Sequence, residues 1–496
     1  MSVALLLEMA ASDAERLGVV SDDQRLTVGE LNALADGGAG VIAETGASSV
    51  VYVGTGGLML PLLIFSSARA ARPFTPLNYR LSGEALAELI DRLPEPLVVY
   101  DAEYADVVTG LGATRIESAQ FVAAAGQAEP VAEFPDPDDV AVVLFTSGTT
   151  SRPKAVELSH NNLTSYVTGT VEFASAEPGD AALICVPPYH IAGVGAALSN
   201  LYAGRKMVYL RKFDPKQWIR LAQSEAVTSA TVVPTMLDRI ITELEANPTP
   251  LPALRTLAYG GSKVALPLVR KALALLPDVG FVNAYGLTET SSTIAVLTPE
   301  DHRTAHAADD EPIRKRLGSV GQPVPGIEVQ IRAEDGTVLG PEEAGELYVR
   351  GDQVSGRYAE IGSVLDAEGW FPTKDVAYLD ADGYLFIGGR SDDTIIRGGE
   401  NIAPAEVEDV LVEHPHVRDV AVVGVEDAEW GQIMVAVVVP VAHITPDPED
   451  LRAHVRQHLR GSRTPDRVVF RHELPTTPTG KVLRRQLADE LKSPTA

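Results

Sequence analysis

Residues 375–393, DVAYLDADGYLFIGGRSDD, decide how the chain is divided. Two apolar runs, VAYL and YLFIGG, flank the turn residues DADG, a pattern typical of an antiparallel β-hairpin. A glycine-rich and acidic stretch, GGRSDDTIIRGGEN, overlaps the end of the hairpin and has the composition of a linker. We therefore expect a first domain over residues 1–390 and a second over residues 391–496, with a hinge near residues 390–393.

The chain before this hairpin has two regions with different sequence patterns. Over residues 2–270, short apolar runs such as VVYVG, LVVYD, VAVVLFTSG and KMVYL alternate with helical segments such as LPLLIFSSARAA. This alternation predicts mostly parallel sheets covered by helices. From about residue 281 to residue 387 the helical periodicity fades, and short runs such as IEVQIRA and GELYVRG lie between turns. The large domain is therefore expected to end in a β-rich subdomain.

The chain after residue 390 has a third sequence pattern. A helical segment, PAEVEDVLVEH, precedes the strand-like runs DVAVVGV and MVAVVVP, and a second helical segment, EDLRAHVRQHL, precedes RVVFR. About a hundred residues of this kind are enough for a small α+β domain. The predicted fold class is therefore α/β: a large N-terminal domain of α/β sheets with a β-rich subdomain, followed by a small α+β C-terminal domain.

Composition excludes several classes of partner. Asp and Glu outnumber Lys and Arg by 68 to 41, which gives a formal net charge of -27, and no basic run compensates it. Nucleic acid and anionic membrane surfaces are therefore not expected partners. The single cysteine, Cys185, excludes an internal disulfide and a cysteine metal cluster, suits a reducing cytoplasm, and is expected to be buried apolar filler.

Neither apolar stretch of the N-terminal region has the features of a targeting or membrane segment. The run in MSVALLLEMAA has no basic residues before it and is interrupted by Glu8, so it predicts a first helix rather than a signal peptide. Residues 56–65, GGLMLPLLIF, are half as long as a membrane span and contain Pro61. We expect a cytoplasmic protein without a membrane span. The sequence does not indicate an oligomeric state.

One loop has side chains suited to a polyphosphate. Residues 145–160, FTSGTTSRPKAVELSH, place several hydroxyls and Lys154 directly after an apolar strand. Hydroxyl, backbone N–H and ammonium groups can all face phosphate oxygens. The Walker pattern is not met, because Pro153 precedes the lysine and Ala155 follows it. Taken alone, the loop is equally well interpreted as a solvated Ser/Thr-rich turn.

Four further stretches favour the interpretation of this loop as a phosphate-binding loop. They are PPYHIAG (residues 187–193), AYGLTET (284–290), the hairpin of residues 375–393 and PTTPTGK (475–481). With the 145–160 loop, these stretches resemble in content and order the core motifs of the adenylate-forming superfamily, which includes acyl-CoA synthetases, adenylation domains of peptide synthetases and luciferases. The resemblance implies a two-step reaction: a carboxylate attacks the α-phosphorus of ATP to give acyl-AMP and pyrophosphate, and a thiol then takes the acyl group.

The resemblance also implies which residues hold the nucleotide. The loop residues that would grip the β- and γ-phosphates are Thr146, Ser147, Gly148, Thr149, Thr150 and Lys154. Tyr285 would lie beside the adenine, and Asp375 and Arg390 would contact the ribose. The other nucleotide-binding positions that it implies are Gly260, Gly261, Ser262, Ala284, Gly286 and Ile387.

For catalysis, the resemblance implies a magnesium ligand and two residues near the α-phosphate. Glu289 would bind Mg²⁺, with Thr288 beside the α-phosphate, and one carboxylate plus phosphate oxygens is the sparse coordination that Mg²⁺ accepts. Lys481 would reach from the small domain to the carboxylate and the α-phosphate and stabilise the charge that develops there. Taken singly, these residues also fit ordinary roles, such as a helix cap for Glu289 and a solvated tail lysine for Lys481.

Three further positions concern the thioester step. Asp392 falls at the family's hinge, about which a mobile small domain changes its orientation. After that change, the pantetheine of coenzyme A would pass Gly398, Gly399 and Glu400. His190 matches an aromatic gate that shields the acyl-adenylate; a histidine with all hydrogen bonds satisfied at a strand end is the equally supported alternative.

Three residues depart from the family pattern. Ser151 and Ala155 stand where the family usually has glycine, and a positive φ at either position would strain the loop or alter its path by about 1 to 2 kcal/mol. Lys263 stands where relatives often have proline or a small residue. We expect Lys263 to be the solvated start of a helix, with pairing to a second substrate carboxylate as the alternative.

We conclude that the sequence predicts an ATP- and magnesium-dependent acyl-CoA synthetase acting on a small carboxylic acid. Two alternatives stay open: an acyl-AMP ligase that loads a separate carrier protein, and a non-catalytic nucleotide sensor. The acyl pocket is expected from residues 189–194, 260–262 and 290–294. The small polar residues of the last segment, TSSTI, favour a short, medium or ring-bearing acid over a very long chain.

Overall fold

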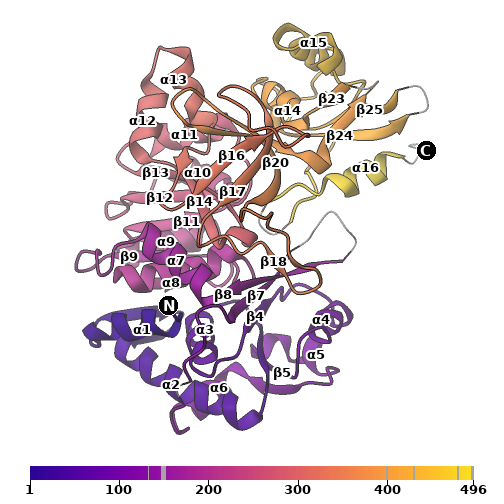
Figure 1. Ribbon diagram of the computed structural model, residues 1–496. Helices are drawn as coiled ribbons and strands as arrows, with labels where there is room; N and C mark the ends of the chain where they lie inside the picture. The colour runs from indigo at the N-terminus through magenta and orange to yellow at the C-terminus, as the bar shows by residue number, and fades with distance from the viewer. Residues whose placement is uncertain (132, 147–151, 398–399, 428–429, 478–479, 493–496) are drawn as a thin grey trace.

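The structure is a computed structural model and describes residues 1–131, 133–146, 152–397, 400–427, 430–477 and 480–492. Two large sheets, one small sheet and a separate C-terminal sheet form the molecule. In Figure 1, the N-terminal elements lie at the bottom, the middle of the chain lies above them, and the small C-terminal unit lies at the upper right. The predicted α/β class, with a large N-terminal domain and a small C-terminal domain, is confirmed.

The first large sheet has nine strands in the order β15-β14-β13-β12-β11-β9-β10-β1-β2. Its central strands are parallel, and antiparallel pairs close both edges. Its strands are β1 (Leu17–Ser21), β2 (Gln24–Thr27), β9 (Ala181–Ile184), β10 (Lys206–Tyr209), β11 (Ser229–Val232), β12 (Thr256–Gly260), β13 (Gly280–Leu287), β14 (Ser292–Leu297) and β15 (Gln322–Pro323).

The second large sheet has eight strands in the order β19-β18-β8-β7-β4-β3-β5-β6. Its last strands are parallel, whereas β7 and β8 pair antiparallel to each other. Its strands are β3 (Ser49–Val53), β4 (Phe74–Leu77), β5 (Pro96–Tyr100), β6 (Thr114–Glu117), β7 (Val140–Thr146), β8 (Lys154–Ser159), β18 (Arg357–Tyr358) and β19 (Gly362–Ser363).

Helices cover both sheets, and α3 (Met59–Arg69) is buried along its whole length. This helix contains most of the apolar run GGLMLPLLIF, and Pro61 lies in its first turn, where proline costs no hydrogen bond. The other helices of the large domain are α1 (Ala4–Ala10), α2 (Val28–Thr45), α4 (Gly83–Ile90), α5 (Ala105–Val108), α6 (Ser118–Ala125), α7 (His160–Thr170), α8 (Ile191–Ala203), α9 (Pro215–Ser224), α10 (Pro234–Ala246), α11 (Leu266–Leu275), α12 (Pro299–Ala307) and α13 (Glu311–Lys315). In the described part of the chain, no helix is long and apolar enough to cross a membrane.

The β-rich region is an antiparallel sheet of four strands in the order β16-β17-β20-β21. These strands are β16 (Glu328–Arg332), β17 (Gly345–Arg350), β20 (Phe371–Leu379) and β21 (Leu385–Arg390). One expectation is wrong: the helical periodicity was expected to fade after residue 281, yet α12 and α13 lie there. Both helices are short, have a proline at one of their first two positions, and have a side-chain N-cap, from Thr298 and Asp310. Capping rather than a long apolar stripe therefore defines them.

The small C-terminal unit is built on a sheet in the order β23-β22-β25-β24, with β26 parallel to β25. Its strands are β22 (Ile395–Arg397), β23 (Glu400–Ile402), β24 (Val417–Asp427), β25 (Gly431–Pro440) and β26 (Arg467–Phe470), and its helices are α14 (Pro404–Val412), α15 (Pro448–His458) and α16 (Arg484–Lys492). The sequence indicated both long strands and the first two helices, but not β22, β23 or α16. The last strand of the four-stranded sheet ends at Arg390, and this sheet begins at Ile395.

Candidate functional site

Asp375 lies at the centre of a buried polar cluster where the β-rich sheet meets β13. The pairing of β20 with β21 sets Asp375 opposite Arg390, whose Nη1 lies 3.4 Å from Oδ1 of Asp375. The phenol of Tyr285, on β13, donates a hydrogen bond to the other carboxylate oxygen. Burial raises the pKa of Asp375, while Arg390, the Tyr285 hydroxyl and the Lys481 ammonium act in the opposite direction. The cluster therefore brings together three predicted nucleotide-binding residues, and the charge of the predicted catalytic lysine acts on its carboxylate.

Lys481, in the small C-terminal unit, lies close enough for its charge to act on the pKa of Asp375. A tight loop holds it: Thr476 and Val482 form a β-bridge, and the backbone N–H of Lys481 donates to the Thr477 hydroxyl at 3.1 Å. The loop lies against α10, because a Cβ added at Gly480 would be 2.8 Å from Cγ2 of Thr235. Gly480 has a φ of +79°, which other residues rarely adopt. Glycine at this position thus allows both the turn and the close approach to α10.

Glu289 and Lys154 share one partner, Tyr358. Glu289 lies in the short 3₁₀ turn Thr288–Thr290, directly after β13, and its Oε1 accepts a hydrogen bond of 2.8 Å from the Tyr358 hydroxyl. The Lys154 ammonium, at the start of β8, lies 5.4 Å from the centre of the Tyr358 ring. Burial and the neighbouring Glu289 raise the pKa of Tyr358, so it stays a neutral donor. The structure therefore places the predicted phosphate-binding lysine at the ring of Tyr358 and the predicted metal ligand at its hydroxyl.

Only part of the predicted phosphate loop can be located. Thr146 ends β7, and its hydroxyl donates to the backbone oxygen of Lys154 at 3.5 Å. Four of the predicted residues lie outside the described part of the chain: Ser147, Gly148, Thr149 and Thr150.

Ala155 does not produce the strain that its place in the motif suggested. It is a buried residue of β8, pairs with Phe145 in a regular ladder, and has no positive φ. Its N–H donates to the carboxylate of Glu360 at 3.2 Å. The expected strain at Ala155 is therefore wrong, because the strand continues through this position. Ser151 lies outside the described residues.

Two predicted glycines are required by strand packing. Gly260 ends β12 and pairs with Ala284 of β13, where a Cβ at residue 260 would lie 2.1 Å from the Ala284 oxygen. A Cβ at Gly286 would lie 1.7 Å from the backbone oxygen of Ser292 on β14. These contacts bring three strand ends close together. Gly261 and Ser262 follow β12 directly, Thr288 follows β13, and Ile387 lies on β21 opposite Ala377.

Some of the buried polar atoms without a hydrogen-bond partner lie in the segments expected to form the acyl pocket. Among the described residues, four such atoms are Oη of Tyr189, Nε2 of His190, Oγ of Ser262 and Oγ of Ser291. Buried polar atoms are usually paired, so these four are available to form hydrogen bonds with a ligand or with water. His190 is therefore not the satisfied histidine of the alternative interpretation.

His190 is the residue before α8, and its ring lies 4.5 Å from that of Tyr189. Burial, with a smaller effect from Arg80, lowers the pKa of His190 to about 4. The imidazole is therefore neutral near pH 7, and it fits an uncharged barrier better than a proton donor.

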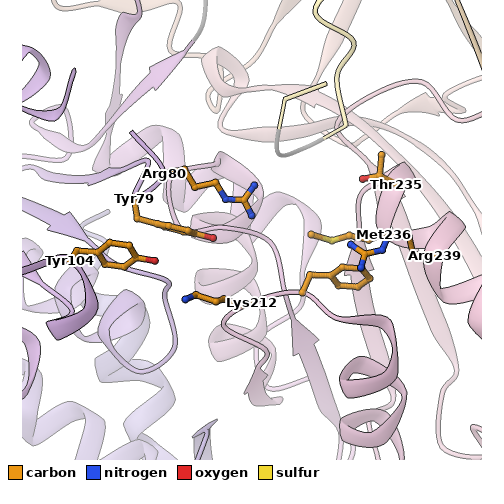
Figure 2. A pocket seen from close by; sticks show the side chains of 8 residues that line it. Tyr79, Arg80, Tyr104, Lys212, Thr235, Met236 and Arg239 are labelled. Carbon is orange, nitrogen blue, oxygen red and sulfur yellow. The ribbon is translucent and has the colours of Figure 1, made fainter. Parts of the chain in front are cut away.

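A cavity of about 400 Å³ opens beside the Lys481 loop. Figure 2 shows Tyr79, Arg80, Tyr104 and Lys212 on one side and Thr235, Met236 and Arg239 on the other, with the pale yellow C-terminal chain approaching near Thr235. Lys212 is paired with Glu103 at 2.6 Å. Within the described chain, neither Arg80 nor Arg239 forms an ion pair with a carboxylate. In a protein of net charge -27, two cations without carboxylate partners make this cavity suited to an anion.

Some predicted residues lie apart from the buried cluster. Glu400, in β23, is exposed and pairs with Arg463 of the same small unit at 3.2 Å. Asp392 is exposed on the 3₁₀ turn Ser391–Asp393 that follows β21. Gly398 and Gly399 lie outside the described residues.

Lys263 is neither a free helix start nor a group facing the expected substrate. Its Nζ lies 2.7 Å from Oδ2 of Asp409 on α14. A second pair joins Arg270 of α11 to Glu413 of the small unit at 3.2 Å. These ion pairs connect the large domain to the small one in the observed orientation. Lys263 and Asp409 lie 146 positions apart, so no local sequence pattern could have identified them as partners.

Sequence reasoning missed Tyr358, Arg80 and Arg239. Arg80 follows TPLNY, outside the five stretches that resemble the family, so the sequence assigned it no role. Arg239 lies in an ordinary amphipathic helix, α10, and only the fold brings it opposite Arg80. Tyr358 belongs to a two-residue strand outside all five motifs. No local signal distinguishes such a position.

Comparison with known proteins gives a consistent result. The profile described as AMP-binding enzyme matches residues 7–359, and the one described as AMP-binding enzyme C-terminal domain matches residues 406–481. A fatty acid–[acyl-carrier-protein] ligase, ScoC, from Streptomyces coeruleorubidus is 32% identical over 458 residues, covering 89% of this chain and 86% of that protein. A feruloyl-CoA synthase from an Amycolatopsis species is 33% identical over 448 residues, covering 88% of each.

Among solved structures, the o-succinylbenzoate CoA synthetase MenE from Bacillus subtilis, in complex with the acyl-adenylate intermediate OSB-AMP, is similar over nearly its whole length. The TM-score is 0.85 at 26% sequence identity, and the match covers 98% of both chains.

Proposed function

The chain belongs to the AMP-binding enzyme family of AMP-forming acid–thiol ligases, and from this premise we propose that it is an acyl-CoA synthetase. The proposed substrates are ATP with Mg²⁺, a small carboxylic acid and coenzyme A. The observation that carries the proposal is the cluster of Asp375, Arg390 and Tyr285, on which the charge of Lys481 from the small domain acts.

In the adenylation step, each residue of this cluster would have a different role. Asp375 offers a carboxylate oxygen pair of the kind that accepts two ribose hydroxyls, and Arg390 holds that carboxylate in place. Lys481 would place its ammonium between the acid and the α-phosphate, where negative charge develops in the transition state. Tyr285 already donates to Asp375, so its ring is fixed beside the proposed adenine position.

Glu289 fits a role as the protein ligand of magnesium. Its Oε1 is occupied by the Tyr358 hydroxyl, and Oε2 has no hydrogen bond with any described residue. A single carboxylate oxygen is a sufficient protein contribution when phosphate oxygens and water complete the coordination. When bound, Mg²⁺ would offset phosphate charge, and Lys154 would screen the same phosphates from β8.

The cavity beside the Lys481 loop supports coenzyme A as the acceptor. Coenzyme A carries phosphate groups at the end opposite its thiol, and Arg80 and Arg239 offer cations that no described carboxylate offsets. His190, whose pKa is lowered mainly by burial and then by Arg80, lies near this cavity and is proposed as the gate between thiol and acyl-adenylate. Asp392 is proposed as the hinge, and Gly398, Gly399 and Glu400 as the pantetheine passage after the domain movement.

A carrier protein is the second candidate acceptor, because ScoC, at 32% identity, is an acyl-carrier-protein ligase. The two acceptors can be separated by comparing coenzyme A with pantetheine, which has the same thiol but no phosphates. We expect a lower KM for coenzyme A, and we expect Arg80→Ala and Arg239→Ala to remove most of that advantage. The matched control is Arg220→Ala, an exposed arginine on α9 outside the cavity.

The proposed acid is short, medium or ring-bearing, with polar groups on its acyl part. Four unpaired buried polar atoms in the predicted acyl segments favour hydrogen-bonding substituents over a long alkyl chain. Feruloyl and o-succinylbenzoate, in the names of two similar proteins, are acyl groups of this kind.

The test is pyrophosphate release from ATP across a panel of carboxylic acids, with and without coenzyme A. The proposal expects acid-dependent release and a coenzyme A thioester with at least one ring-bearing or short polar acid. Acid-dependent release without thioester would support the carrier-protein alternative. No acid-dependent release would overturn the proposal in favour of a nucleotide sensor.

A further inference from the structure

A cluster of imidazoles lies in the small domain and is not used by the proposed reaction. Four of the ten histidines of the chain are His414, His416, His454 and His458, and each ring lies within 5.2 Å of another, measured between centres. His414 and His416 follow the end of α14, and His454 and His458 lie on α15. In Figure 1, α15 is at the top of the view, at the outer end of the small domain.

Three side chains of this region converge on one point. Single ligand atoms of His414, His416 and Asp450 all lie within 4.8 Å of one another. Asp450 belongs to the first turn of α15, and its Oδ2 lies 3.3 Å from Nε2 of His414. The Asp450 side chain is 59% exposed while that of His414 is 8% exposed, so the group opens to solvent on the aspartate side.

The spacing fits a tetrahedral metal ion. Zinc bonds of about 2.0 to 2.1 Å to histidine nitrogen or carboxylate oxygen place two ligands of a tetrahedron about 3.3 to 3.4 Å apart. The His414–Asp450 distance of 3.3 Å already has this value. The His416 atom needs only a side-chain adjustment, because it lies within 4.8 Å of both. Two imidazoles and one carboxylate, with water as a fourth ligand, are a donor set that suits Zn²⁺ and not Mg²⁺ or Ca²⁺, which prefer oxygen.

The backbone defines which nitrogen of His414 is available. The N–H of His416 donates to Nδ1 of His414 at 3.3 Å, so Nε2 is the atom directed at Asp450. In this tautomer Nε2 carries the ring proton, so metal binding at Nε2 requires the proton to move to Nδ1, where it takes the place of the hydrogen bond from the His416 N–H. The loop itself is fixed by backbone bonds from the His414 N–H to the Leu411 oxygen and from the Val417 N–H to the His414 oxygen.

We propose that His414, His416 and Asp450 form a binding site for one Zn²⁺ or a similar borderline divalent ion. The ion would connect the end of α14 to the first turn of α15, two elements that already pack together. This site lies in the small domain alone and shares no residue with the proposed Mg²⁺ site at Glu289. Its role would therefore be to stabilise the small domain.

The experiment is calorimetric titration of chelator-treated, tag-free full-length protein with ZnCl₂ at about pH 7.5, above the usual imidazole pKa. One equivalent should bind, and His416→Ala and Asp450→Asn should each weaken binding at least tenfold. His414→Ala is a harsher variant, because this side chain is buried. The matched controls are His472→Ala, an exposed histidine outside the cluster, and Glu289→Gln, and both should bind Zn²⁺ like the wild type.

Two further measurements separate a built site from loose surface binding. Bound Co²⁺ should give the visible spectrum of a tetrahedral complex in the wild type but not in His416→Ala. Zn²⁺ should raise the thermal unfolding temperature of the wild type and of His472→Ala, but not of Asp450→Asn. The proposal is overturned if no equivalent binds, if a large excess of Mg²⁺ displaces the Zn²⁺, or if the cluster variants bind as tightly as the controls.

Discussion

The hydroxyl of Tyr358 donates a hydrogen bond of 2.8 Å to Glu289. Through its ring, the same tyrosine contacts the ammonium of Lys154, 5.4 Å from the ring centre. A two-residue strand thus orients the proposed magnesium ligand and the proposed phosphate ligand together. This hydrogen bond restricts the side-chain conformation of Glu289 before any ligand binds. Such preorganisation lowers the entropic cost of binding a metal–phosphate complex.

Tyr358→Phe should therefore reduce adenylation without abolishing it. Losing one hydrogen bond to a charged group costs about 1.5 to 3 kcal/mol where the group stays desolvated, and less where water replaces the hydroxyl. We expect a fall of about tenfold in kcat/KM for ATP, together with a higher Mg²⁺ requirement. Pyrophosphate release measured against Mg²⁺ concentration checks this. Tyr348→Phe, which loses a hydroxyl on β17 and keeps its ring contact with Arg332, is the matched control and should behave like the wild type.

The interdomain pair of Lys263 and Asp409 should bias the domain orientation that brings Lys481 to the site. Both side chains are about half exposed, so the pair is worth about 0.2 to 1 kcal/mol. Lys263→Asp should slow adenylation by up to about fivefold relative to thioester transfer, and Lys263→Asp with Asp409→Lys should restore the ratio. Lys271→Asp, which breaks a pair with Glu245 inside the large domain, serves as the control. If Lys263→Asp, the double variant and Lys271→Asp all give the same ratio of adenylation to thioester transfer, the pair does not influence domain orientation.

His190 makes the folded protein sensitive to acid. Its pKa of about 4 in the folded state lies below the usual unfolded value of about 6.5, so the unfolded chain binds a proton first. The stability that neutral His190 contributes is present above about pH 6.5 and is lost as pH falls toward 4. Between pH 7 and pH 5 this loss amounts to about 2 kcal/mol.

His190→Phe should flatten that dependence, because phenylalanine keeps the ring contact with Tyr189 and removes the ionisable group. Urea unfolding of the wild type and the variant at both pH values measures the difference. His472→Gln, at an exposed position, should leave the wild-type pH dependence unchanged. An equally steep dependence in His190→Phe would show that other groups, such as His160, whose pKa is also lowered by burial to about 4, account for it.

The architecture was largely predictable because its signals are local. Alternating apolar runs and helical segments identified several strands of both large sheets, and turn residues identified the hairpin that carries Asp375 and Arg390. The helices α12 and α13 were missed because their definition depends on caps and on packing rather than on a long apolar stripe.

The site was predictable only where motifs mark it. Lys481 and Asp375 lie in motifs, and the fold places Lys481 where its charge acts on Asp375, although the two are far apart in sequence. Tyr358, the Arg80–Arg239 pair and the Lys263–Asp409 contact are products of tertiary packing between segments that have no common pattern. Ala155 shows the opposite error: a motif position suggested a strained loop, whereas the observed strand runs straight through it.

Ala155→Gly should accordingly bring no gain. Because Ala155 is buried in β8 with no positive φ, glycine there removes packing and adds flexibility, at a cost of about 0.5 to 1 kcal/mol of stability. The KM for ATP should stay within twofold of the wild type. A KM for ATP lowered severalfold, with equal or greater stability, would mean that this position limits closure of the loop over ATP.

The central claim is that Lys481, carried by the small domain, drives acid adenylation at the Asp375 cluster. The most direct measurement is acid-dependent exchange of pyrophosphate into ATP by the wild type, Lys481→Ala and, as control, Lys492→Ala on α16. Thioester formation from preformed acyl-AMP is measured beside it. We predict exchange by the wild type and the control, a loss of at least a hundredfold in Lys481→Ala, and near-normal transfer to coenzyme A by all three. Equal loss of both half-reactions in Lys481→Ala, or undiminished exchange in that variant, would contradict the account.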